Sequence, residues 1–189
     1  MRRVLFRCSL IGGLVAFIWG VLSWMALPMH KDCFKKFKDE SQVAEAIREN
    51  THGDGMYILP NTLHYNCNTP QKEIHRGARM LENGPFMFAS VRMDGLGGMS
   101  VMPFVLAIIT QIIGAFIVTW MLLQSKITGF RQKVGFVTLF GLAIGILSQI
   151  PDAVWWGFSI WYVFINMLDL VIAWFLAGLV IAKFSTKSS

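Results

Sequence analysis

Residues 158–182 read FSIWYVFINMLDLVIAWFLAGLVIA and contain a single charged side chain, Asp169. An α-helix rises about 1.5 Å per residue, so about 20 apolar residues cover the roughly 30 Å hydrocarbon core of a bilayer. This stretch therefore predicts a transmembrane helix. It is continuously apolar and lacks the alternation of a lipid-facing strand, which favours a helix over a strand of a membrane barrel.

Three further apolar blocks predict membrane spans at residues 10–27, 101–123 and 134–150, the last of which is short. Across 189 residues the chain is 54% hydrophobic and 15% charged, which is typical of a multi-span membrane protein rather than a water-soluble domain. We expect a membrane all-α fold: a bundle of four transmembrane helices, with residues 28–100 inserted between the first and the second helix.

Basic residues are distributed unevenly around these blocks. Residues 1–9, 124–133 and 183–189 together carry eight Lys or Arg and no Asp or Glu, whereas residues 28–100 carry nine of each sign and residues 151–157 carry one Asp. The positive-inside rule therefore predicts that both termini are cytoplasmic and that segments 28–100 and 151–157 lie outside, in a bacterial inner membrane. Topology explains the net charge of +6, so nucleic acid is not predicted as a partner.

The segment 28–100 is too long for a plain connection, and we expect it to form a small α/β extracytoplasmic domain. Asp39 and Gln42 form a capping-box pattern at the start of a helix that ends near residue 50. Periodicity predicts a second helix over 70–82, and strands over 56–59 and 86–93. One face of the second strand is expected to cover the two helices.

Two of the three cysteines, Cys33 and Cys67, fall in this outer segment. A disulfide between them would stabilise a small domain by roughly 3 to 4 kcal/mol in the chain-entropy model, and we predict that it forms. Both cysteines also follow a histidine at the same spacing, so a metal site formed by His30, Cys33, His64 and Cys67 stays open as an alternative.

Asp169 lies about eleven residues into the last predicted span, where a carboxylate costs roughly 2.5 to 3.5 kcal/mol on insertion scales. Asn166 shares its helical face, and Gln111 lies at a similar depth in the second span, so Asp169, Asn166 and Gln111 are predicted to form an intramembrane polar cluster. Two interpretations stay open for Asp169. It is either a proton- or cation-binding group or a hydrogen-bonded link between helices.

Small residues at a spacing of four indicate close helix contacts in three of the spans. The patterns are Ala16-x-x-x-Gly20, Gly141-x-x-x-Gly145 and Ala173-x-x-x-Ala177.

Several short runs resemble a group of uncharacterised bacterial multi-span membrane proteins, and the likeness covers most of the chain. The runs are Trp19-Gly20 to Ser23, Leu27-Pro28, Gly55 to Pro60, Gly84-Pro85, Trp156-Gly157-Phe158 and Leu176 to Val180. In that group a His often follows the Ser, whereas this chain has Trp24, so the resemblance implies no metal role at that position. The group has no established activity, and the resemblance therefore implies no catalytic residue.

The sequence contains no familiar hydrolase constellation, nucleotide-binding loop, HExxH motif or pair of carboxylates. We therefore expect a structural or accessory protein without a cofactor, in contact with membrane lipid and with other membrane proteins or a second copy. A small transporter or a proton- or cation-linked sensor centred on Asp169 is the first alternative. An extracytoplasmic metal-binding protein is the second, and an enzyme without a familiar motif stays open.

Overall fold

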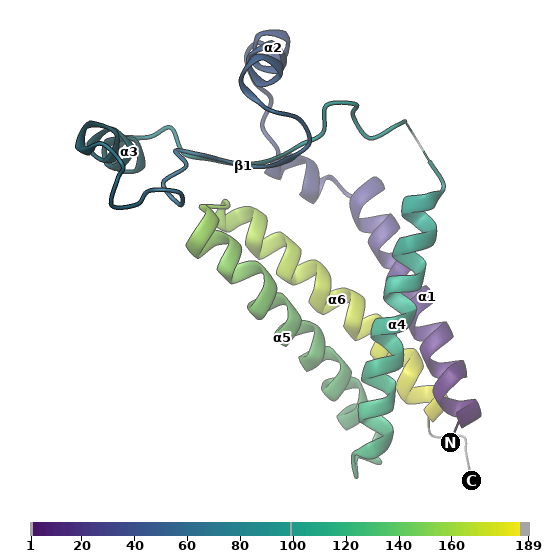
Figure 1. Cartoon of the computed structure of the whole chain (residues 1–189). Helices are drawn as coiled ribbons and strands as arrows, with labels where there is room; N and C mark the ends of the chain where they lie inside the picture. The colour runs from purple at the N-terminus through teal and green to yellow at the C-terminus, as the bar shows by residue number, and fades with distance from the viewer. Residues whose placement is uncertain (1, 99, 186–189) are drawn as a thin grey trace. The chain divides into compact units, whose positions relative to one another are not determined.

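The computed structural model describes residues 2–98 and 100–185 and is mostly helical. Four helices among these residues are long and apolar enough to cross a membrane, which is the predicted number: α1 (Arg2–Met25), α4 (Met102–Gln124), α5 (Phe130–Trp156) and α6 (Ile160–Ser185) (Figure 1). The chain divides into two compact units, residues 1–35 with 100–189, here called the helical unit, and residues 36–99.

Two of the four helices extend well beyond the predicted spans. Helix α1 begins at Arg2, eight residues before the apolar block, and α5 covers Phe130–Trp156 instead of 134–150. Hydropathy detects only the part of a helix that lipid can surround, whereas the backbone hydrogen bonds continue through polar flanking residues. Helix α5 continues past Pro151 and ends at Gly157, whose φ of +67° provides a left-handed cap.

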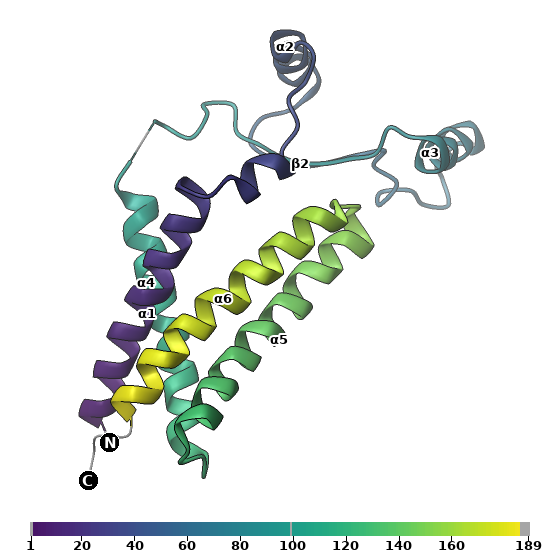
Figure 2. The same cartoon turned by 180° about the vertical axis from the view of Figure 1, so that it is seen from behind.

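In the helical unit, α6 lies between α5 and α1, and α4 packs mainly on α1 (Figures 1 and 2). The start of α1 meets the end of α6, where Cys8 Sγ is 3.9 Å from the carbonyl oxygen of Ile181 and the Arg7 guanidinium lies 4.4 Å from the ring centroid of Phe184. Lys133, at the start of α5, donates a hydrogen bond to Ser185 at the same end. The predicted cytoplasmic ends of these three helices are therefore together.

The buried core follows the α1–α4, α1–α6 and α5–α6 contacts. Its members are Cys8, Ala16, Val118, Leu122, Val137, Trp174, Ala177 and Ile181. Glycines allow two of these approaches: a Cβ at Gly13 would lie 2.6 Å from Ile112 Cα, and one at Gly141 would lie 2.6 Å from Trp174 Cβ. By contrast, a Cβ at Gly20 would meet nothing within 4 Å. The predicted Ala16-x-x-x-Gly20 pattern therefore did not include Gly13, the glycine of α1 that lies against α4.

The second unit contains α2 (Glu40–Asn50), β1 (Gly55–Leu59), α3 (Gln71–Asn83) and β2 (Met87–Val91), close to the predicted ranges. The strands pair antiparallel, with Tyr57 opposite Ala89. Asp39 caps α2, because its carboxylate accepts hydrogen bonds from the backbone of the next turn.

Among the described residues of this unit only Pro60 and Gly77 are buried. Helix α2 has no buried residue, and Gly77 of α3 is close to Tyr65 rather than to the sheet. The expected packing of the two helices against a strand is therefore not formed. The apolar faces of α2 and α3 carry too few large side chains to enclose a core. A domain with its own hydrophobic core between α1 and α4 is not confirmed.

The predicted disulfide is not found either, since all three cysteines lie in the described residues and are free. Cys33 belongs to the helical unit, where its thiol donates to the carbonyl oxygen of Met29 at 3.4 Å, and Cys67 is exposed in the other unit. The described part of the chain also holds no group of three or more His, Cys, Asp or Glu arranged to bind a metal ion. The alternative metal site, which would join residues of both units, therefore gains no support from the described residues.

Candidate functional site

A short 3₁₀-helix, η1 (Pro28–Cys33), carries a histidine back into the helical unit. Pro28 has no backbone N–H and disfavours helical geometry in the residue before it, and Leu27 is extended, so α1 cannot continue through this point. The 3₁₀-helix contacts both α1 and α6. As a result His30 is only 2% exposed, although it lies outside every apolar block of the sequence.

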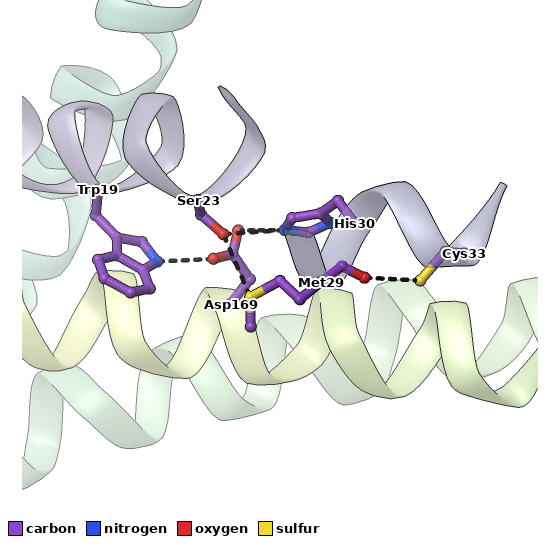
Figure 3. A network of polar contacts seen from close by, with 6 residues as sticks. All are labelled: Trp19, Ser23, Met29, His30, Cys33 and Asp169. Atoms are coloured by element: carbon purple, nitrogen blue, oxygen red, sulfur yellow. Dashed lines mark hydrogen bonds and ion pairs between the residues drawn. The ribbon is translucent and has the colours of Figure 1, made fainter. Parts of the chain in front are cut away.

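The carboxylate of Asp169, on α6, meets side chains from both α1 and η1 (Figure 3). The indole Nε1 of Trp19 donates a hydrogen bond to Asp169 Oδ1 at 2.7 Å, and His30 Nε2 lies 3.8 Å from Asp169 Oδ2. The side chain of Asp169 is 13% exposed. A carboxyl group in this position is stabilised by the Trp19 donor, which comes from a helix at the far end of the sequence.

The contacts of Ser23 indicate which nitrogen of His30 carries the proton. Ser23 Oγ lies 3.0 Å from His30 Nε2 and donates to the sulfur of Met29 at 3.9 Å, so its lone pairs are free to accept from Nε2–H. The other ring nitrogen, Nδ1, is buried without a partner. A buried unpaired N–H costs more than a buried unpaired acceptor, so we assign the neutral ring a proton on Nε2.

Ser23, His30 and Asp169 are the residue types of a serine-hydrolase triad, but their geometry differs. In a triad the carboxylate binds Nδ1 while Nε2 faces the serine. Here both partners converge on Nε2, and Ser23 is 0% exposed, so a substrate does not reach its hydroxyl. The arrangement therefore does not activate a nucleophile. Instead Trp24 covers the imidazole, stacked at 4.0 Å between ring centroids and 15° between planes.

Next to this group is a cavity of about 620 Å³ that is open on one side and is lined by residues of all four long helices. It is lined by Ala16, Phe17, Trp19, Gly20, Val21, Trp24, Met25, Pro103, Phe104, Ala107, Gln111, Gln149, Asn166, Asp169, Leu170 and Ala173. The three residues of the predicted polar cluster, Gln111, Asn166 and Asp169, thus line one cavity, although the described contacts of Asp169 go to α1 and η1. Asn166 Nδ2 is buried without a partner.

Sequence reasoning missed Trp19, Ser23 and His30 as members of the site. The sequence analysis assigns Trp19 no role in the site, and it places His30 in the outer segment because His30 follows the apolar block by three residues. The usable signal was Asp169 itself: a buried carboxylate requires a donor. His30 is the histidine nearest in sequence to a span.

No protein-family model matches this chain, and neither a curated protein nor a solved structure matches it significantly. The resemblance drawn from short sequence runs therefore stays a prediction, and the argument for function rests on the site.

Proposed function

We propose that the chain is a multi-pass sensor or accessory protein of a bacterial inner membrane, in which the Asp169–His30 pair takes up and releases a proton. Both termini and the α4–α5 link are cytoplasmic in this proposal. The support is that basic residues flank the spans at this end, where α1 begins and α6 ends, as the positive-inside rule requires.

The observation that carries the proposal is a buried histidine beside a partly buried carboxylate where α1, η1 and α6 meet. Histidine side chains usually change charge between about pH 5 and 8. A proton on His30 converts a neutral contact with Asp169 into an ion pair, which strengthens the attraction between η1 and α6. The neighbouring ionisable residues on η1, Lys31 and Asp32, are exposed to solvent, so Asp169 is the charged group that faces the ring in the described residues.

The connectivity of the chain determines how a proton on His30 would affect the rest of the protein. Only Phe34 and Lys35 separate η1 from the unit 36–99, so a shift of η1 acts on the start of that unit. The exposed surface of the unit suits contact with other membrane proteins or a second copy, and we place it outside the membrane. Catalysis is not part of the proposal, because the geometry at Ser23 does not activate a nucleophile.

The stacked Trp24 provides the test. A protonated imidazole quenches an adjacent indole more strongly than a neutral one, so the tryptophan emission of the purified protein in nanodiscs should fall as the pH is lowered from about 8 to 5. The fall should disappear in His30→Gln and in Trp24→Phe.

The matched control is His75→Gln, which removes a histidine from the 36–99 unit and should leave the titration unchanged. A titration that persists in His30→Gln would overturn the proposal, as would a flat wild-type profile.

A further inference from the structure

The cavity beside Asp169 has features that the proton-binding pair does not use. Its volume of about 620 Å³ lies within the range of small-molecule sites. Apolar and aromatic side chains form most of the wall, and a few polar groups converge on it, which is the usual composition of a ligand pocket.

The polar groups of the wall select for positive charge. Among the described residues that line the cavity, Asp169 is the only one with a charged side chain, and Gln111, Gln149 and Asn166 are neutral amides. Asp169 retains accepting capacity, because a carboxylate accepts about four hydrogen bonds and one described hydrogen bond, from Trp19, occupies Oδ1. An anion would meet a carboxylate here without a compensating base.

The aromatic part of the wall fits the same class of ligand. Trp19 and Trp24 both line the cavity, and tryptophan is the side chain that attracts ammonium groups most strongly through its ring face. One face of the Trp24 ring is stacked on His30, which leaves the opposite face for a cation. Asn166 Nδ2 is a donor without a partner in a residue that is 9% exposed. A ligand that also carries an oxygen acceptor would satisfy this donor.

We propose that this cavity binds an organic ammonium group carrying a nearby oxygen acceptor, with Asp169 and the two indoles as the cation site. The same chemistry occurs in a free amino alcohol and in the headgroup of a zwitterionic phospholipid. The proposal goes beyond the proton-binding function and does not require His30 to titrate.

Choline is the probe for the free ligand, and 3,3-dimethyl-1-butanol is its neutral isostere. The full-length protein is placed in phosphatidylglycerol nanodiscs, which contain no ammonium lipid, and tryptophan emission is followed during titration at pH 8. A second arm uses nanodiscs of phosphatidylethanolamine and phosphatidylglycerol in equal amounts, with native mass spectrometry to identify the lipid that stays bound.

A pair of glycine variants tests whether binding occurs in the cavity. Gly20 lines the cavity and a Cβ added there meets nothing within 4 Å, so Gly20→Leu places additional side-chain volume in the cavity. Gly135→Leu is the matched control, since Gly135 on α5 also faces open space but does not line the cavity. Equal thermal unfolding of the two variants shows that both are folded.

We expect saturable choline binding in the wild type and Gly135→Leu, weakened about tenfold or more in Gly20→Leu and in Asp169→Asn, and no matching response to the isostere. Retention of phosphatidylethanolamine over phosphatidylglycerol, lost in Gly20→Leu, supports the lipid as the source. Equal binding of choline and its isostere would overturn the proposal, as would the absence of both choline binding and lipid preference. Choline and lipid binding are measured at the single pH of 8. A failed pH titration of His30 therefore does not decide the outcome of the binding experiments.

Discussion

Adding one methyl group to α1 at Gly13 should force α1 and α4 apart. The Cβ of alanine would lie 2.6 Å from Ile112 Cα and 2.8 Å from Ile112 N, whereas ordinary contacts begin at 3.4 Å. The obstacle is backbone, so no side-chain rotation relieves the clash, and the helices must separate by roughly 1 Å. Overpacking of this kind costs about 1 to 3 kcal/mol. Compared with a Gly→Ala change at an open position of the same helix, Gly13→Ala should therefore lower the free energy of unfolding by that amount.

Gly20→Ala on the same helix is the control, because the added Cβ meets nothing within 4 Å. Alanine is the better helix former, so this variant should gain about 0.5 to 1 kcal/mol. The gain in helix propensity applies at both positions, so the two variants should differ by the overpacking cost of about 1 to 3 kcal/mol when unfolded by sodium dodecyl sulfate in mixed micelles and followed by circular dichroism. Equal stability of the two proteins would show that the α1–α4 contact is looser than described.

Two further predictions concern the Asp169 site and the cysteines. Trp19→Phe removes the donor to Asp169 and should lower the free energy of unfolding by about 1.5 to 3 kcal/mol. The control Trp161→Phe, at a position 55% exposed, should change this free energy little. A larger loss in Trp161→Phe than in Trp19→Phe would contradict the assigned hydrogen bond. In intact cells a membrane-impermeant thiol reagent should label Cys67 without prior reduction and should not label Cys8, which is 0% exposed. Labelling of Cys67 only after reduction would show that it is disulfide-bonded.

The number and approximate position of the spans could be predicted, because lipid imposes a direct requirement on length and apolarity. The same reasoning misplaced the start of α1 by eight residues, since Arg2 to Ser9 are helical without being lipid-soluble. Helices α2 and α3 and both strands followed from local capping and periodicity. Whether they enclose a core depends on long-range contacts that local patterns do not encode, and the expected packing failed there.

Of the residues in contact at the site, only Asp169 could be predicted from the sequence. Asp169 stands out because a charge inside an apolar block is costly. Its partners do not stand out, since Trp19 has several ordinary uses in a membrane helix and His30 becomes buried only through the reversal of the chain at Pro28. A hydropathy profile assigns each residue a depth from its neighbours in sequence, and it therefore cannot detect a segment that folds back.

The contact of α1 with α6 also imposes an order of events during synthesis. Helix α6 is the last of the four to leave the ribosome, so α1 waits in the membrane while α4 and α5 are inserted. Until then Trp19 has no carboxylate to bind, and the small residues of α1 that face α6 are open to lipid or to membrane chaperones. A chain truncated before α6 retains the α1–α4 pair but lacks Asp169 and the three core residues of α6, Trp174, Ala177 and Ile181. Incomplete products thus differ from the finished protein in a first helix that is paired with α4 but lacks its contact with α6.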